Sequence, residues 1–109
     1  MADLGGGVHV MGTDSETWVP DDEVGGQVQI LFEDGDTAGG LWQPGAHYST
    51  AENVLPARET IVVLQGTVRI EIDDGPTLEL TAGAVASMPS GARTYWQPSP
   101  DFKEVWLYS

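Results

Sequence analysis

The sequence predicts an all-β domain, folded as a small antiparallel barrel or sandwich. Fourteen glycines and seven prolines divide the 109 residues into short segments joined by tight turns. The segments are rich in Val, Ile, Leu and Thr, and several of them alternate apolar with polar residues, which is typical of strands. No segment keeps a helical period for more than one turn. We therefore expect seven to nine short strands in one domain.

The first part of the chain predicts an arm followed by a pair of strands. Residues 1–17 are Gly-rich and polar, which indicates an N-terminal arm with no more than an edge strand, and the domain itself is expected to span residues 18–109. From Gln27 onward, alternation places three apolar side chains on one face of the first strand: Val28, Ile30 and Phe32. An Asp-Gly turn then returns the chain into a strand at residues 39–43.

The second half continues this pattern after an irregular stretch at residues 46–57, which predicts a loop. Residues 60–65 form a continuous apolar run, which predicts a strand covered on both faces. Later strands are separated by glycine or proline turns, and we expect them at residues 68–72, 78–81, 84–88, 93–97 and 104–108.

Charge and composition exclude several functions. Four Lys and Arg residues against 17 Asp and Glu residues give a net charge of −13. Such a charge repels phosphate backbones and anionic lipids, so nucleic acid and membrane partners are not expected. The chain has no cysteine, which excludes disulfides, thiolate nucleophiles and cysteine-based zinc sites. The N-terminus has no basic residue and no apolar run of signal-peptide length, so we expect a cytoplasmic protein.

Two spaced motifs cross the middle of the chain. They read Glu59-x6-Gly66 and Gly83-x5-Pro89-Ser90-Gly91-x2-Thr94. This frame resembles the cupin family, whose metal-binding motifs are His-x-His-x(3 or 4)-Glu-x6-Gly and Gly-x5-Pro-x-Gly-x2-His. Trp96 and the aromatic closing strand are similar to the small cupins related to ureidoglycine aminohydrolase and to the ethanolamine-utilisation cupin. The resemblance covers residues 18–108 and implies a cupin-type β-barrel or jelly-roll sandwich.

Three of the four ligand positions that the resemblance implies hold other residues. Asn53 and Leu55 replace the first two histidines and Thr94 replaces the third, so only Glu59 keeps a ligand-type side chain. Leu55 cannot bind a metal, and Asn53 and Thr94 are poor ligands for first-row metals. We therefore expect no metal and no other cofactor in the barrel.

Glu59 is the first candidate for chemistry. The resemblance implies that its strand face lines the barrel together with Thr94 and Trp96. A carboxylate in such an apolar interior would be desolvated, so its pKa should rise and it could act as a general acid or base near neutral pH. The alternative is a structural role, in which Glu59 sits at the barrel mouth in contact with water or loop amides.

Other candidates are weaker. His47 could transfer a proton beside Glu59, although a lone histidine in a long loop is more often a surface residue. Trp42 and Trp96 could contact a ligand, and Asn53 and Thr94 could orient its polar atoms, while buried aromatics are by default core residues. Arg93 alternates with Thr94, so it is expected on the surface in an ion pair.

Three functions remain open from the sequence. The first is a metal-independent cupin that binds a small organic molecule and uses Glu59 as acid or base in an isomerisation, elimination or cyclisation. The second is a ligand-binding or sensor cupin without catalysis, and the third is a metal enzyme with a non-standard His47, Glu52 and Glu59 site. A homodimer is also expected, because residues 60–65 and 104–108 are apolar on both faces and small cupins commonly pair through such sheets.

Overall fold

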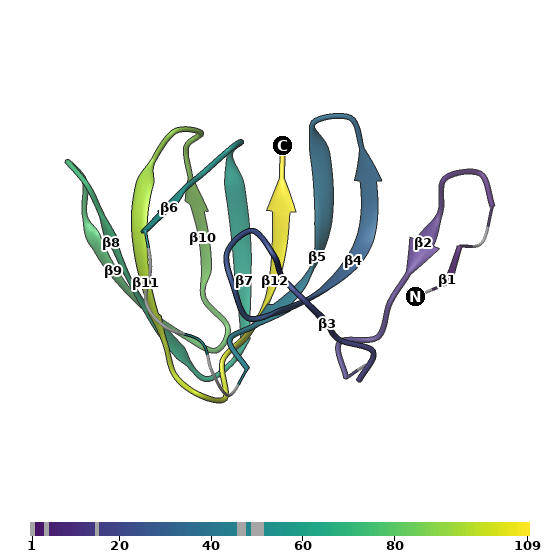
Figure 1. Cartoon of the computed structure of the whole chain (residues 1–109), viewed down its shortest axis with the longest axis horizontal. Coiled ribbons are helices and arrows are strands. Elements are labelled where there is room, and N and C mark those ends of the chain that lie inside the picture. The colour runs from purple at the N-terminus through teal and green to yellow at the C-terminus, as the bar shows by residue number, and fades with distance from the viewer. Residues whose placement is uncertain (1, 4, 15, 46–47, 49–51) are drawn as a thin grey trace.

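The computed structural model describes residues 2–3, 5–14, 16–45, 48 and 52–109, and over these residues it contains strands and turns but no helix (Figure 1). The chain is therefore all-β, as the alternating sequence pattern predicts. The described part of the chain consequently offers no helix that could cross a membrane.

Two antiparallel sheets face each other and enclose the core (Figure 1). The larger sheet has six strands in the order β10 (Val85–Met88), β7 (Glu59–Gln65), β12 (Lys103–Tyr108), β5 (Thr37–Gln43), β4 (Gln27–Asp34) and β3 (Val19–Pro20). The smaller sheet has four, in the order β6 (Glu52–Val54), β11 (Arg93–Pro98), β8 (Thr67–Ile72) and β9 (Thr77–Thr81). Neighbouring strands are mostly distant in sequence, so the chain passes repeatedly between the sheets, as in a jelly-roll sandwich.

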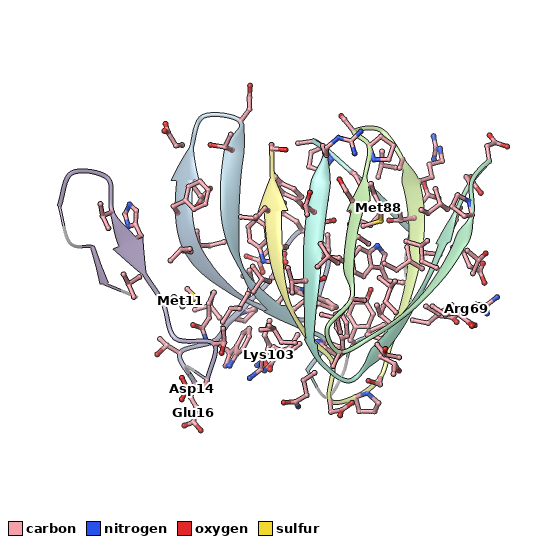
Figure 2. The ribbon with its side chains drawn as sticks, turned by 180° about the vertical axis from the view of Figure 1, so that it is seen from behind. Met11, Asp14, Glu16, Arg69, Met88 and Lys103 are labelled. Atoms are coloured by element: carbon pink, nitrogen blue, oxygen red, sulfur yellow. The ribbon has the colours of Figure 1, made fainter. Side chains whose placement is uncertain are left out.

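Strand alternation decides which side chains enter the core. Glu59, Ile61 and Val63 of β7 are buried, whereas the residues between them are only partly covered. In the smaller sheet β8 and β11 alternate in the same way, and Figure 2 shows Met88 of β10 inside the molecule and Arg69 of β8 at its outer edge. The inner faces of both sheets thus form one core, to which Leu55, Val68, Ile70, Trp96 and Phe102 also contribute.

The N-terminal arm makes its own small sheet. The strands β1 (Ala2–Asp3) and β2 (His9–Val10) pair with each other and with neither main sheet in the described residues. Figure 1 shows this hairpin beside β4, at the edge of the molecule. Lys103 of β12 donates a hydrogen bond from Nζ to the Thr13 carbonyl at 3.2 Å, which ties the following segment to the larger sheet.

The structure contains features that the sequence pattern did not predict. Its described residues form twelve strands, more than the expected seven to nine, because β1, β2 and β3 have two residues each and β6 has three. The strand β6 lies within residues 46–57, where only a loop was expected. It forms because Arg93, Thr94 and Tyr95 of β11 pair with it, a long-range contact that has no local sequence signal.

A bulge in β4 places Phe32 on the opposite face of the strand from the one that the sequence predicts. Ile30 pairs with Gly40 and Phe32 with Gly39, so Leu31 is an extra residue in the strand. The bulge reverses the alternation, and Phe32 lies against Gly39 and Leu107 rather than on the same face as Val28 and Ile30. Glu33 takes the inward position instead and reaches the pocket described below.

Candidate functional site

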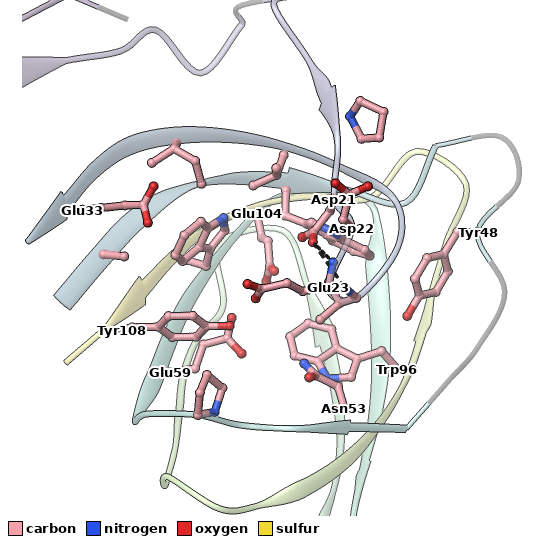
Figure 3. A pocket seen from close by; sticks show the side chains of 18 of the residues that line it. Asp21, Asp22, Glu23, Glu33, Tyr48, Asn53, Glu59, Trp96, Glu104 and Tyr108 are labelled. Carbon is pink, nitrogen blue, oxygen red and sulfur yellow. Dashed lines mark hydrogen bonds between the residues drawn. The ribbon is translucent and has the colours of Figure 1, made fainter. Parts of the chain in front are cut away.

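A pocket of about 560 Å³ opens between the two sheets, under the loop that joins β3 to β4 (Figure 3). Its floor comes from the inner faces of β5, β7, β11 and β12, and its rim from residues 20–24 and from the β4–β5 hairpin. A volume of this size suits a small organic molecule. Two kinds of side chain dominate the lining, namely acidic residues and aromatic rings.

Glu59 lies at the start of β7 with 5 % of its surface exposed. Tyr108 of β12 is its partner across the strands. No described residue forms a hydrogen bond with Glu59 Oε1, although this atom is buried. Burial and the nearby negative charge of Asp21 raise the pKa of Glu59 to about 7, because both disfavour the ionised carboxylate.

Glu104 of β12 is a second buried carboxyl group, with 2 % of its surface exposed. It pairs across the strands with Trp42 on one side and Val63 on the other. Its Oε2 atom is also buried without a hydrogen-bond partner among the described residues. Burial first, and then the charge of Glu59, raise the pKa of Glu104 well above its usual value.

The loop of residues 21–26 places further acids at the pocket. Asp21 Oδ1 accepts hydrogen bonds from the amides of Glu23 (2.9 Å) and Val24 (3.2 Å), which closes a tight turn. Trp42 Nε1 donates to the Gly25 carbonyl at 2.9 Å, and Gly26 lies so close to the Trp42 ring that a Cβ atom there would be 2.8 Å from it. The loop is therefore held against Trp42, and Glu23 extends toward Glu104 (Figure 3).

Aromatic rings form the apolar walls. The Trp42 ring packs edge-on against Tyr48 at a centroid distance of 5.2 Å and against Trp96 at 6.3 Å. Trp106 and Tyr108 form a second pair at 5.1 Å. Figure 3 shows Tyr108 on one side of Glu59 and Glu104, and Trp96 and Tyr48 on the other.

Thr94 lies outside the pocket and makes hydrogen bonds to two of the residues that line it. It is fully buried, donates its hydroxyl hydrogen to the Asn53 carbonyl at 2.7 Å, and accepts a hydrogen bond from Trp96 Nε1 at 2.8 Å. Asn53 and Trp96 line the pocket, but Thr94 does not. Thr94 therefore fixes the Trp96 ring and the β6 backbone, and the expectation that it orients a ligand directly does not match its position.

The residues at the family's metal-ligand positions do not fit a metal. Leu55 is a core residue with 1 % exposure, and the Thr94 hydroxyl is engaged by Asn53 and Trp96. Within the described ranges no group of three His, Asp or Glu side chains is placed to hold an ion. Asn53 and Glu59 remain, and one amide and one carboxylate are too few for a catalytic first-row metal.

Glu52, one of the three residues of the expected non-standard metal site, is engaged in other contacts. Its Oε1 accepts a hydrogen bond from Arg93 Nη1, and its Oε2 accepts one from the Tyr95 hydroxyl at 3.2 Å. This contact confirms the expected surface ion pair of Arg93. The expected role of His47 lies outside the described residues.

Comparison with known proteins decides the family. A model of the EutQ-like cupin domain matches residues 40–103, which is more than half of the chain. The protein belongs to the EutQ-like cupin family. No curated protein sequence matches it significantly.

Solved structures agree with this cupin fold. A crystal structure described as ethanolamine utilization protein Q from Salmonella typhimurium LT2 is 19% identical, with a TM-score of 0.67, and the match covers 84% of this chain and 76% of that one. The EutQ protein of Clostridium difficile gives 17% identity and a TM-score of 0.65, covering 90% and 73%. A cupin-2 domain protein from Shewanella frigidimarina gives 20% identity and 0.57, covering 73% and 76%. At these identities the similarity shows the fold alone.

Sequence reasoning missed Glu104, Tyr108 and the acidic loop of this cupin. The sequence does contain a pattern that indicates Glu104. Strand alternation places Glu104 on the same face as Trp106 and Tyr108 in the closing strand, and a carboxyl group on an aromatic face is a candidate for a buried charge. The contribution of Asp21 and Glu23 had no such signal. These two residues precede β4 in the chain and reach the pocket only because the loop folds back onto Trp42.

Proposed function

We propose that this protein is a metal-independent cupin that binds a small organic molecule in the barrel and uses Glu59 to transfer a proton. The observation that supports it best is the buried, unpartnered oxygen of Glu59 in a pocket of about 560 Å³. A carboxyl group with a pKa of about 7 is present in both protonation states at neutral pH, which is what a general acid or base requires.

The neighbouring groups suit proton transfer without a cofactor. Glu104 is a second buried carboxyl whose charge is linked to that of Glu59, so one member of the pair can hold a proton while the other is ionised. Such a pair could remove a proton at one position of a substrate and return it at another, as in an isomerisation, elimination or cyclisation. The aromatic walls would exclude water from the reacting atoms.

A ligand-binding cupin without catalysis is the second candidate. It is favoured by the hydrogen bonds of the pocket tryptophans, since Trp42 Nε1 and Trp96 Nε1 both donate to the protein itself. Both indole N–H groups are therefore already used, so these rings offer apolar contact to a ligand but no proton donor to a reaction, which favours recognition by shape.

Two experiments test the proposal in sequence. Native mass spectrometry and elemental analysis of freshly purified protein should show a bound organic mass and metal well below one equivalent. Near-stoichiometric metal with no organic ligand would contradict the proposal.

Once the ligand is identified, turnover by the wild type and by Glu59→Gln should be compared. An acid or base catalyst should lose about 100-fold or more in turnover, because proton transfer contributes rates of that order. Binding of the ligand by both proteins without turnover would favour the sensor function. The variant Glu16→Gln is the matched control, since Glu16 is exposed in the N-terminal arm and does not line the pocket (Figure 2).

A further inference from the structure

The charges around the pocket are all of one sign among the described residues. Eight carboxylate side chains line it, from Asp21, Asp22, Glu23, Glu33, Asp36, Glu52, Glu59 and Glu104. None of the four Lys and Arg residues of the chain lines it. An anionic ligand would therefore meet repulsion from the rim inward, whereas a cation would be attracted.

The basic residues make their contacts away from the floor of the pocket. Arg58 donates to Ser87, Arg69 pairs with Glu71 and Glu79, and Lys103 donates to the Thr13 carbonyl. Arg93 pairs with Glu52, which is one of the eight lining carboxylates, but Arg93 does not itself line the pocket and contacts neither Glu59 nor Glu104 in any described hydrogen bond or ion pair. No described internal cation is thus available to balance the two carboxyl groups at the pocket floor.

The second observation is that these two carboxyl groups each have a buried oxygen without a hydrogen-bond partner. Glu59 Oε1 and Glu104 Oε2 are buried acceptors without a hydrogen-bond partner among the described residues, and both residues line the pocket. A buried acceptor that loses water and gains no donor is costly, and such groups in native proteins are usually satisfied by something bound. The missing partner must bring hydrogen-bond donors, and a positive charge would compensate the carboxylates fully.

The aromatic walls indicate an organic cation rather than a metal ion. Faces of tryptophan and tyrosine attract organic ammonium groups, while Mg²⁺ or Ca²⁺ require six or more oxygen ligands. Five aromatic rings line the pocket, namely Trp42, Trp96, Trp106, Tyr48 and Tyr108. Figure 3 shows Tyr108 on one side of the carboxyl pair and Trp96 and Tyr48 on the other. N–H donors are needed for the two free oxygens, which favours a protonated amine over a quaternary ammonium ion.

We propose that the ligand of this pocket is a small protonated amine, with its ammonium group between Glu59 and Glu104 and its carbon skeleton against the aromatic walls. This inference rests on the proposed function, since it names the class of molecule that the barrel binds. Binding of the amine favours ionisation of the carboxyl pair, so a proton leaves the pocket as the ammonium enters.

The groups that face the Glu59 carboxylate govern this proton release. Asp21 and Glu23 come from the loop above it, and Glu104 and Tyr108 come from β12. Burial and the negative charge of Asp21 favour the protonated form of Glu59 in the free protein, while Tyr108 stays neutral because its own pKa is raised. An ammonium ion reverses that preference locally.

The test compares three probes of similar size, namely butylammonium, 1-butanol and butanoate, by the chemical shifts of the tryptophan indole N–H signals. We use about 0.15 M NaCl so that attraction by the net charge alone is screened beyond about 8 Å. Butylammonium should shift the indole signals and bind at least about tenfold more tightly than 1-butanol, because it alone supplies charge and several donors. Butanoate should not bind.

Variants locate the site. Glu59→Gln and Glu104→Gln should each lower the affinity for butylammonium by about tenfold or more, since each removes one charge-assisted hydrogen bond. Glu16→Gln should bind like the wild type. Affinity of the wild type for butylammonium should also rise between about pH 6 and about pH 8, because the pair must lose a proton on binding.

The outcomes separate this inference from the proposed function. If 1-butanol binds as tightly as butylammonium, or if native mass spectrometry finds a neutral or anionic molecule in the barrel, the inference is wrong while the small-molecule function stands. If no probe shifts the indole signals, or if Glu59→Gln and Glu104→Gln leave butylammonium binding unchanged, the inference is wrong. Stoichiometric metal and no organic ligand would overturn the proposed function itself.

Discussion

The two carboxyl groups at the pocket floor link the stability of the molecule to pH. A buried carboxyl whose pKa is raised in the folded state stabilises the fold below its unfolded pKa, and this contribution is lost as the pH rises through the folded pKa. Burial raises the pKa of Glu59 from the ordinary value of 4.5 to about 7. The loss should therefore develop between pH 4.5 and about pH 7 and stay constant at higher pH.

Glu59→Gln should remove this penalty. The variant is expected to match the wild type near pH 4, where Glu59 is protonated in both states, and to exceed its free energy of unfolding by about 3 kcal/mol at pH 8. Urea unfolding at a series of pH values measures the difference. Glu16→Gln should show no pH-dependent difference. A Glu59→Gln protein that is less stable than the wild type at pH 8 would show that the carboxylate has a partner.

Thr94 permits a second test at the residue scale. Thr94→Val keeps the side-chain shape but leaves Trp96 Nε1 and the Asn53 carbonyl without the hydroxyl that both now contact. Unpaired buried groups cost about 1–3 kcal/mol, so unfolding should become easier by that amount. The Trp96 indole N–H signal should also move and exchange faster with solvent. Thr94→Ser keeps the hydroxyl and should preserve that signal. An unchanged indole signal in Thr94→Val would contradict the role given to Thr94.

At the scale of strands, the sequence predicts those elements whose evidence is local. The strands β4, β5 and β7 to β12 follow from alternation and from glycine or proline turns, and each lies within a few residues of its expected place. The cupin frame of Glu59 and Gly66 also indicates which face of β7 enters the barrel. These features depend on neighbouring residues in the chain and are therefore visible in the sequence.

The remaining elements depend on contacts between distant segments. The strand β6 exists because β11 pairs with it, and the acidic loop lines the pocket because it packs on Trp42. Phe32 leaves its expected face because of the bulge at Leu31, which no local pattern marks. Glu59 was accordingly found from the motif, whereas Glu104, on the neighbouring strand, was found only from strand register.

Gly40 pairs with Ile30 beside the bulge in β4, and the close approach of the two strands there allows a test. A Cβ atom on Gly40 would be 2.0 Å from the Gln29 carbonyl oxygen and 3.2 Å from the Ile30 Cα atom, and neither backbone atom can move without shifting β4. Gly40→Ala should therefore destabilise the fold by about 3 kcal/mol or more. Thermal and urea unfolding measure this effect.

Gly83 provides the comparison, because its φ of +94° disfavours alanine while nothing lies within 4 Å of the added Cβ. Gly83→Ala should cost only about 1–2 kcal/mol through backbone strain. If Gly40→Ala is tolerated better than Gly83→Ala, the close approach of β4 and β5 is not the reason for a glycine at position 40.

At the scale of the whole molecule, charge and apolar surface are distributed unequally. The acids gather around the pocket, while the outer face of β7, β10 and β12 carries an apolar patch that we define as Val62, Leu64, Val85, Val105 and Leu107. Val62 pairs across the strands with Val85 on one side and with Val105 on the other, so these three side chains are neighbours in one row. Val85 is 65% exposed and Leu107 40% exposed. A row of this kind on a sheet face typically contacts another protein surface.

The homodimer expected from the sequence stays a prediction, and this patch is where we place its interface. A twofold axis over the row would bring the same valines of two copies together, which is the self-complementary contact of a symmetric dimer. Sedimentation of the wild type at micromolar concentration should give the mass of two chains. Val85→Glu introduces like charges across the axis and should give monomers with an unchanged far-ultraviolet spectrum. Val54→Glu is the matched control, because Val54 is 47% exposed on β6 of the other sheet and lies outside the patch, so its dimer should persist. A monomeric wild type, or a Val85→Glu variant that still sediments as a dimer, would contradict this interface.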